Sequence, residues 1–328
     1  MHHTAVVGWP TVSVVMPVRN EAEGLAAAVA AVLTQDYPLA FDVCLAVAPS
    51  DDGTERIAAE LAAADARVRV VPNPAGATPA GLNAAIAATT GDVVVRVDGH
   101  ARLSPGYIRQ AVTTLRATGA VNVGGVQAAV GETPFEQAVA TAMTSLLGTG
   151  GSRFHVGGQP GPVDTVYLGV FDRAAGDAVG WFDERLIRNQ DYELNIRLRE
   201  AGGTVWFDPE LSVTYRPRST LRALAKQYYE YGWWKAEVLR QHPSSLKARQ
   251  AAPAALPAVL AAAAVAGRWW RPAWLVPAGY AAAVAIGSKL NPRVVLATTT
   301  MHLAWGLGFA LATVRAVSET VRSSRWAH

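Results

Sequence analysis

The feature that most restricts the fold is an alternation of short, β-branched apolar segments with alanine-rich segments in the N-terminal third of the chain. The segments predicted as strands are 11–18, 41–48, 68–71 and 92–98. Helical segments follow the first three, and this order builds right-handed βαβ units on one parallel sheet. The last segment is almost continuously apolar, as expected of a central strand covered on both faces. The sequence therefore predicts an α/β domain whose mostly parallel sheet is flanked by helices.

Polar residues follow three of these predicted strands, in the loops 18–24, 48–54 and 98–104. Ligands of an open parallel sheet bind at the carboxyl ends of the strands, so these loops are expected to converge on one crevice. Asp98 and His100 lie two positions apart at the end of the apolar strand. A carboxylate and an imidazole in this arrangement can hold a divalent cation that bridges a diphosphate, although a strand-end aspartate also occurs simply as part of a turn.

The composition indicates a membrane-associated part. The chain has 328 residues, 51% of them hydrophobic, and the apolar excess lies after residue 250. Three apolar stretches cover 251–266, 273–287 and 294–313. Only the last has the roughly 20 residues of a full membrane span, so the first two are expected to form a hairpin of two short spans or a re-entrant pair. A soluble, alanine-rich helical bundle is the alternative.

Two further stretches have an unusual composition. Residues 119–182 are rich in glycine, which predicts a loop-dominated region on the side of the acceptor. The amphipathic segment 221–239 carries a group of aromatic residues, Tyr228, Tyr229, Tyr231, Trp233 and Trp234. Such rings fit a membrane interface and a packed aromatic core equally well. Basic residues flank every boundary of the apolar stretches alike, so the positive-inside rule does not choose an orientation.

The charge and cysteine content exclude several classes of protein. The net charge is only +3, and no run of Lys and Arg is long enough to indicate nucleic acid as a partner. The mild basic excess suits an anionic membrane surface instead. The single cysteine, Cys44, excludes an internal disulfide framework and indicates a reducing compartment. The N-terminal segment shows no secretory signal.

Several separated motifs occur together in a characteristic order. The first three are 17–21 (PVRNE), 50–54 (SDDGT) and 98–100 (DGH), and later ones include 188–194 (RNQDYEL) and 227–232 (QYYEYG). With these motifs the chain resembles family 2 glycosyltransferases of the GT-A fold, and within them the succinoglycan-biosynthesis type. The resemblance implies a Rossmann-like, mostly parallel sheet flanked by helices, followed by a C-terminal α-helical transmembrane region.

The resemblance also implies roles for matching positions. The residues expected to bind the donor are Pro17, Arg19, Glu21, Asp52, Asn83 and Asp98. Asp98 and His100 would hold Mn²⁺ or Mg²⁺ on the donor diphosphate, and Asp191 matches the catalytic base. A plain helix N-terminal carboxylate is the alternative for Asp191. Six further residues are expected either to contact the acceptor or to support the residues that contact the substrates. They are Arg188, Gln190, Glu193, Gln227, Trp233 and Trp234.

The implied function is the inverting, metal-dependent transfer of one sugar from a nucleotide-sugar donor, a UDP-hexose, to a lipid-linked or cell-envelope glycan acceptor. Two departures from the family pattern bear on this. The family's second strand ends in an aspartate that contacts uracil, but this chain has Val47, Ala48 and Pro49 there, so the base of the donor stays open. Glu230 stands where processive members carry arginine, which favours one sugar per event.

Two other functions compete with this one. A dinucleotide-binding oxidoreductase should carry G-x-G-x-x-G after the first strand, and the loop 17–21 lacks it. A non-catalytic, sugar-nucleotide-binding membrane protein of the same fold remains the alternative. The expected organisation is a catalytic domain at 1–220, an interfacial helical segment at 221–250 and transmembrane helices at 251–328. The expected location is the inner cell membrane, with membrane lipids as partners and the catalytic domain in the cytoplasm.

Overall fold

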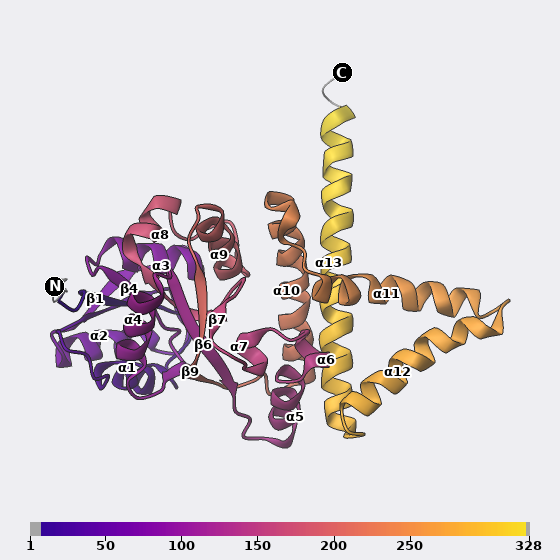
Figure 1. Cartoon of the computed structure of the whole chain (residues 1–328), viewed down its shortest axis with the longest axis horizontal. Coiled ribbons are helices and arrows are strands. Elements are labelled where there is room, and N and C mark those ends of the chain that lie inside the picture. The colour runs from indigo at the N-terminus through magenta and orange to yellow at the C-terminus, as the bar shows by residue number, and fades with distance from the viewer. Residues whose placement is uncertain (1–7, 326–328) are drawn as a thin grey trace, which may run out of the picture. The chain divides into compact units, whose positions relative to one another are not determined.

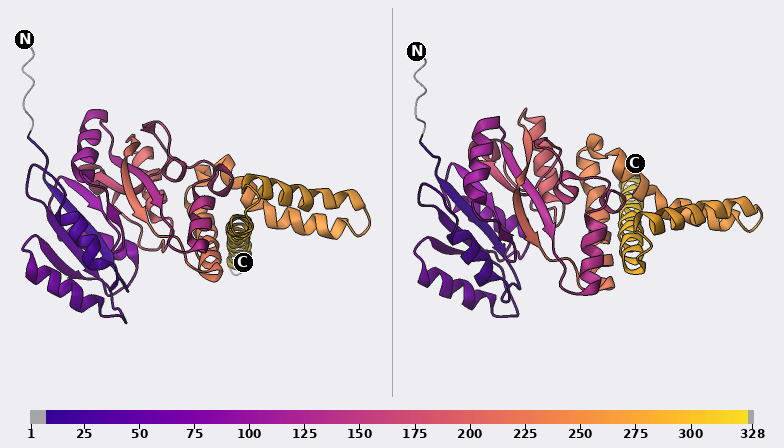
Figure 2. Two further views of the ribbon diagram at one scale, coloured as in Figure 1. Left: turned by 90° about the horizontal axis from the view of Figure 1, so that it is seen from below. Right: turned by 60° about the horizontal axis from the view of Figure 1, so that its bottom comes forward.

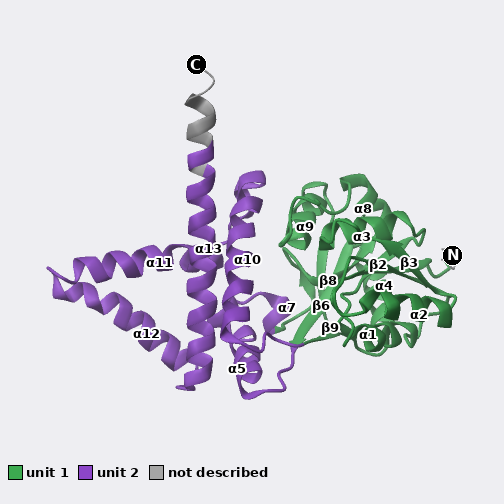
Figure 3. Cartoon of the chain, turned by 180° about the vertical axis from the view of Figure 1, so that it is seen from behind, with its two compact units in different colours: residues 1–128, 157–215 green, residues 129–156, 216–328 purple. Residues whose placement is uncertain are grey.

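The computed structural model describes residues 8–325, which form two compact units (Figure 3). Unit 1 runs to Ala128 and resumes at Gly157–Tyr215, and unit 2 contains Ala129–Val156 and the chain from Arg216 on. Residues 129–156, which sequence analysis placed inside the catalytic domain, thus group with the C-terminal helices. The first seven and last three residues of the expected domains lie outside the described residues.

Unit 1 contains the alternating elements that the sequence predicts. Its strands are β1 Val12–Val18, β2 Asp42–Val47, β3 Val68–Pro72, β4 Val93–Arg96, β5 Arg102–Leu103, β6 Asn122–Ala129, β7 Gly161–Pro162, β8 Tyr167–Asp172 and β9 Val205–Tyr215. Its helices are α1 Leu25–Leu33, α2 Thr54–Ala64, α3 Thr78–Ala87, α4 Tyr107–Thr118, α8 Arg173–Val179 and α9 Gln190–Glu200. The four strands predicted in the N-terminal third are confirmed within two residues at each end.

These strands form one mixed sheet in the order β3-β2-β1-β4-β8-β6-β9-β5, and β7 pairs with β9 (Figure 1). The first four strands are parallel, and Val14 lies opposite Val43 on one side and Val95 on the other. β8 joins β4 in the antiparallel direction, as β6 joins β8. The parallel half therefore brings the loops after β1, β2 and β4 to one edge, as predicted.

Helices cover both faces of this sheet because alternate strand residues point to opposite sides. Val14 and Leu45 belong to a core cluster that includes residues of α1 and α4. Val15 and Cys44 belong to a second cluster that includes residues of α3 and α9. Burial raises the pKa of the Cys44 thiol to about 11, which keeps it protonated and inert.

The expectation of a loop-dominated region at 119–182 is wrong, because this segment contains β6, β8 and several helices. Two of its glycines lie inside β6 where neighbouring chain approaches closely. A Cβ at Gly125 would lie 2.0 Å from the carbonyl oxygen of Leu211 in β9, and one at Gly124 would lie 2.7 Å from the Val166 side chain. Glycine in this strand therefore serves close packing and does not mark a loop.

Unit 2 is helical. Its α-helices are α5 Pro134–Met143, α6 Leu146–Thr149, α7 Arg153–Val156, α10 Leu221–Gln241, α11 Ala248–Ala266, α12 Leu275–Gly287 and α13 Pro292–Arg325, and two 3₁₀ turns, η1 Pro243–Ser245 and η2 Arg271–Trp274, join some of them. Within this unit α10 lies along α13, and α11 and α12 extend sideways as a hairpin (Figures 1 and 2). Two segments are long and apolar enough to cross a membrane, Arg249–Ala266 and Pro292–Ala316.

Candidate active site

Arg96 links two carboxylates from distant parts of the chain. It ends β4 with only 5% of its surface exposed. Its Nη2 donates to Asp98 Oδ1 at 2.9 Å, and its Nη1 donates to Asp191 Oδ1 in the first turn of α9. A buried guanidinium requires such partners, because an unpaired buried charge is strongly destabilising. The two carboxylates expected to act in metal binding and proton transfer are therefore brought to one place.

Sequence reasoning assigned no role to Arg96. The signal that marks it is a charge inside an otherwise apolar strand, VVVRVD, which a buried parallel strand tolerates only when the charge is paired. The identity of its second partner was not visible, because Asp191 lies 95 residues further along the chain.

The surroundings push the pKa values of the two carboxyls apart. Burial raises the pKa of Asp191, and the nearby Asp98 charge adds to this increase, against the opposing effect of Arg96. Burial acts in the same direction on Asp98, but Arg96 and His100 outweigh it and hold the pKa of Asp98 below its ordinary value. Asp191 is thus the more basic of the pair, which suits a proton acceptor, whereas Asp98 suits a cation ligand.

Three strand-end loops converge, as the sequence predicts. His100 Nδ1, after β4, lies 2.8 Å from Oε1 of Glu21, after β1. A Cβ at Gly99 would lie 3.0 Å from the Glu21 side chain, so glycine permits this approach. The backbone N–H of Glu21 donates to Thr54 Oγ1 at 2.9 Å, which ties the loop after β2 to the same place.

Asp52, expected near the nucleoside, holds two of these loops together. Its Oδ2 accepts from the backbone N–H of Ala22 at 3.0 Å, and its Oδ1 accepts from Thr54. The hydrogen bond from the Thr54 hydroxyl, with help from the Ala22 N–H, lowers the pKa of the Asp52 carboxyl. Asn20 and Ser50 add a further bond between the same loops. These contacts tie the loops after β1 and β2 to each other.

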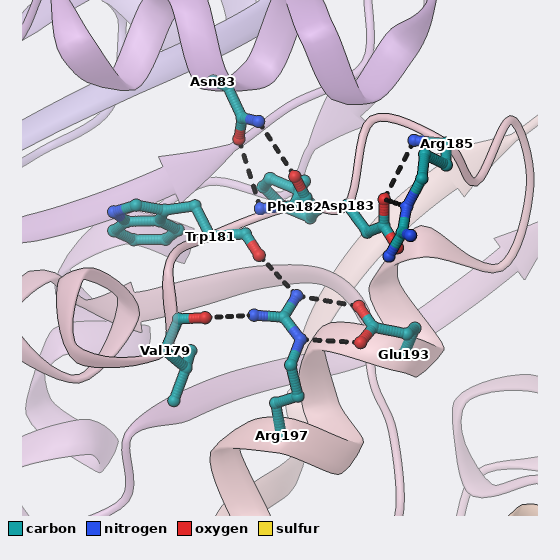
Figure 4. A network of polar contacts seen from close by, with 8 residues as sticks. All are labelled: Asn83, Val179, Trp181, Phe182, Asp183, Arg185, Glu193 and Arg197. Atoms are coloured by element: carbon teal, nitrogen blue, oxygen red, sulfur yellow. Dashed lines mark hydrogen bonds and ion pairs between the residues drawn. The ribbon is translucent and has the colours of Figure 1, made fainter. Parts of the chain in front are cut away.

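Two other residues expected at the donor contact neighbouring loops. Arg19 Nη1 donates to the carbonyl oxygen of Gly76 at 3.3 Å, and a Cβ at Gly81 in α3 would lie 3.4 Å from Pro17 Cβ. Asn83 of α3 makes two hydrogen bonds to the backbone of Phe182. Its Nδ2 donates to the Phe182 carbonyl oxygen, and its Oδ1 accepts from the Phe182 N–H (Figure 4). Asn83 therefore anchors the loop that precedes α9.

Glu193 and Arg197 hold the same loop from the other side (Figure 4). Arg197 makes two parallel bonds to the Glu193 carboxylate, at 2.6 and 2.7 Å, and also donates to the carbonyl oxygens of Val179 and Trp181. The Glu193 side chain is 2% exposed. The loop and the first turn of α9 are thus fixed together, which sets the position of Asp191.

The remaining expected residues fall into two groups. Arg188 lies close enough to Asp98 to help lower its pKa, and Gln190 begins α9 with 6% exposure. Gln227, Trp233 and Trp234 belong to α10 in unit 2. Gln227 Nε2 donates to the Tyr231 hydroxyl, and the Trp233 ring lies beneath the Arg315 guanidinium. Only the first group shares a unit with Asp191.

Asp98 and His100 carry the oxygen and nitrogen atoms that divalent cations take as ligands, and their other contacts are compatible with that role. Arg96 donates two hydrogen bonds to Asp98, and both end on Oδ1. The other oxygen, Oδ2, therefore lies outside this ion pair. The Glu21 carboxylate beside His100 Nδ1 is a common means of orienting a metal-binding imidazole. No three His, Cys, Asp or Glu side chains of residues 8–325 gather into a self-sufficient ion site. Mg²⁺ often takes one or two protein ligands and fills its other positions with substrate phosphates and water.

Comparison with known proteins identifies the family of the chain. Residues 13–182 match the family described as Glycosyl transferase family 2. The succinoglycan biosynthesis protein ExoA of Rhizobium meliloti is 32% identical over 308 residues, which cover 90% of this chain and 93% of the relative. A dolichyl N-acetyl-α-D-glucosaminyl phosphate 3-β-D-2,3-diacetamido-2,3-dideoxy-β-D-glucuronosyltransferase of Methanococcus voltae is 23% identical over 70% of this chain and 74% of its own length.

A solved structure shares the fold. The mannosyltransferase PcManGT from Pyrobaculum calidifontis, in complex with GDP-Man and Mn²⁺, superposes with a TM-score of 0.68 and 20% identity over 94% of this chain and 88% of that chain. The family match covers more than half of the chain, and the relative from Rhizobium meliloti matches almost from end to end. This chain therefore belongs to glycosyl transferase family 2 and is a glycosyltransferase with the GT-A fold.

Proposed function

We propose that this glycosyltransferase moves one hexose per event from a UDP-sugar to a lipid-linked or cell-envelope glycan acceptor, with inversion at the anomeric carbon and with Mn²⁺ or Mg²⁺ as cofactor. The observation that supports this most directly is the Arg96 bridge between Asp98 and Asp191. One carboxylate of lowered pKa and one of raised pKa meet at the edge of the sheet where ligands bind.

Asp191 is the proposed general base. Its side chain is 33% exposed, so one part contacts Arg96 while another part is open to an acceptor. A raised pKa favours proton uptake from a hydroxyl group as that oxygen attacks the anomeric carbon. Glu193 is poorly suited to the same task, because Arg197 binds both of its oxygens.

Asp98 and His100 would hold the cation. When bound, the cation supplies positive charge that stabilises the departing nucleoside diphosphate without any proton donor. PcManGT was solved with GDP-Man and Mn²⁺, which supports a divalent cation in this fold. Glu21 orients His100, and Arg96 keeps Asp98 ionised. The loops after β1 and β2, tied by Asp52, form the proposed wall of the nucleoside site.

Membrane association is the third part of the proposal. The segments Arg249–Ala266 and Pro292–Ala316 are apolar enough for a bilayer, and several tryptophans around 269–274 are largely exposed. An apolar surface of this extent requires cover by lipid or by a partner. The proposed location is the inner cell membrane, with the catalytic unit on the cytoplasmic side, where an acceptor attached to a lipid would be presented.

The experiment that tests the proposal is calorimetric binding of a panel of UDP- and GDP-sugars to the purified full chain, with and without EDTA, together with an assay of sugar transfer. We expect binding of a UDP-hexose that requires the metal and is lost in Asp98→Asn. Asp36→Asn is a matched control, since Asp36 is an exposed carboxylate that pairs with Arg109 at the surface. Binding that is indifferent to EDTA would overturn the metal role, and binding without any transfer would favour the non-catalytic alternative.

A further inference from the structure

The two candidate membrane segments differ in what covers them. In the apolar 18-residue window of Pro292–Ala316 in α13, 33% of the residues are buried, whereas in Arg249–Ala266 of α11 only 6% are buried. α13 is covered largely by α10. A Cβ at Gly232 of α10 would lie 1.9 Å from the carbonyl oxygen of Trp305, and one at Gly308 would lie 2.1 Å from the carbonyl oxygen of Tyr229. The backbones of α10 and α13 therefore touch near the middle of the apolar segment of α13.

α10 is too highly charged for the interior of a bilayer. Its charged residues are Arg222, Lys226, Glu230, Lys235, Glu237 and Arg240. The Lys226 side chain is 77% exposed and lies within two turns of Gly232, the point of contact with α13. If α13 crossed the membrane, α10 would be carried into the hydrocarbon beside it, and the side chains of Lys226 and Arg240, which are 77% and 56% exposed, would face lipid. Each ionised side chain at that depth is strongly disfavoured.

The hairpin of α11, η2 and α12 has the opposite character. No Asp, Glu, Lys or Arg occurs between Arg249 and Arg268, and none occurs between Arg271 and Lys289. α11 has 19 residues, and η2 and α12 together have 4 and 13 residues. At the rise of each helix type, both arms are about 28 Å long. This length is comparable with the hydrocarbon thickness of about 30 Å, and the inner turns of both arms pack against α13.

The two ends of the hairpin suit the two faces of a bilayer. At the tip, Trp269 and Trp270 are 78% and 65% exposed and lie between Arg268 and Arg271, and amphipathic aromatic and basic residues are typical of membrane interfaces. The base carries more basic residues than the tip, namely Lys247, Arg249, Lys289 and Arg293. The folded hairpin therefore has more basic residues at its base than at its tip, a difference that cannot be seen along the linear sequence. By the positive-inside rule this difference favours a cytoplasmic base.

The attachment of the hairpin agrees with a helix α13 that lies along the membrane surface. The first turns of α11 pack against α13, where a Cβ at Gly306 would lie 2.2 Å from the Pro253 carbonyl oxygen. The Tyr280 hydroxyl of α12 lies 3.1 Å from His302 Nδ1 of α13. Both arms therefore return to the same helix, and the hairpin extends sideways from it (Figures 1 and 2). The exposed apolar residues of α13 include Leu296, Leu307, Leu311 and Val314.

We propose that the hairpin of α11, η2 and α12 alone crosses the bilayer, and that α13, held by α10, lies on the cytoplasmic surface without crossing. The proposal rests on the membrane association stated under the proposed function. It replaces a transmembrane α13 with an interfacial one, whose apolar side contacts lipid and whose other side contacts the charged helix α10.

Cysteine labelling tests this topology directly, because Cys44 is the only cysteine of the chain and is buried. In a Cys44→Ser background, single cysteines replace Ser244 before the hairpin, Trp270 at its tip and Ser318 near the end of α13. The probe is a membrane-impermeant maleimide, added to right-side-out and to inside-out membrane vesicles. We expect Ser244→Cys and Ser318→Cys to be labelled in inside-out vesicles only, and Trp270→Cys in right-side-out vesicles only.

Every other pattern overturns the proposal. Labelling of Ser318→Cys together with Trp270→Cys would mean that α13 crosses. Labelling of all three from one side would mean that the hairpin does not cross, as in a soluble bundle. A tip that is labelled from neither side until SDS is added would mean a re-entrant hairpin. None of the three positions belongs to the proposed catalytic machinery, so a failure of transfer in the parent chain would count against the proposed function and leave the labelling interpretable.

Discussion

The Arg96 site of unit 1 and the α11–α12 hairpin of unit 2 break the usual distribution of residues in opposite ways. Arg96 is a charge placed inside, and it is matched there by two carboxylates. The hairpin is an apolar surface placed outside, and few of its residues are covered. Buried charges and large exposed apolar surfaces are both uncommon in soluble proteins. The proposed active site is built on the first exception, and the proposed membrane contact on the second.

The largest effect is expected on the rate of transfer, from Asp191→Asn in the Arg96 site. The variant keeps the shape and a hydrogen bond to Arg96 but loses the proton acceptor, so transfer should fall about 10²–10⁴-fold. Donor binding, measured by calorimetry, should remain. Asp36→Asn, which changes a surface carboxylate paired with Arg109, should leave both quantities unchanged. Normal transfer by Asp191→Asn would remove the base assignment.

Arg96→Met tests whether the buried charge is needed to hold the site together. Removal of the guanidinium leaves two neighbouring carboxylates without their common partner, so the free energy of unfolding should fall by about 3 kcal/mol. This value is near the lower end for a broken buried ion pair, because both carboxylates are partly exposed. Arg96→Lys keeps one charge but cannot form the two-sided fork, so an intermediate loss is expected. Denaturant unfolding followed by tryptophan fluorescence measures the change. Equal stability of all three proteins would contradict the bridge.

A matched pair of substitutions sharpens the contrast within unit 2. Val259 of α11 and Leu307 of α13 are each 47% exposed and lie near the middle of their apolar segments. Val259→Asp should weaken membrane insertion by about 2.5 kcal/mol, because the carboxylate would enter hydrocarbon. Leu307→Asp should have a much smaller effect, because α13 is proposed to lie at the surface. Flotation with lipid vesicles measures the bound fraction, and equal losses would indicate that both helices cross.

The smallest effect is expected from Glu193→Gln. Arg197 would keep its bonds to the carbonyl oxygens of Val179 and Trp181, so the loss of one charged partner should cost about 1–2 kcal/mol of stability. Transfer should stay close to the wild-type rate, since Glu193 supports the loop before α9 and is not the proposed base. A loss of transfer as large as that of Asp191→Asn, with donor binding intact, would instead make Glu193 the proton acceptor.

Much of unit 1 could be predicted because its signals are local. The apolar segments of β1, β2, β3 and β4 are separated by helical segments, and that order alone specifies parallel pairing and the edge at which the loops meet. The convergence of Glu21 and His100 followed from this rule. The glycines of β6 misled the prediction, because a glycine in a loop and a glycine against a neighbouring backbone have the same local signature.

The sequence by itself determined the alternating α/β order, the family motifs and the apolar character of the C-terminal helices, because each depends on residues close together in the chain. Only the tertiary structure decided that Arg96 joins Asp98 to Asp191, that Arg197 and Asn83 hold the loop before α9, and that α10 packs on α13. These contacts join residues that are far apart in the sequence, and the sequence does not show which of them become neighbours in space. Charge pairing, helix packing and burial depend on which residues are neighbours in the folded chain.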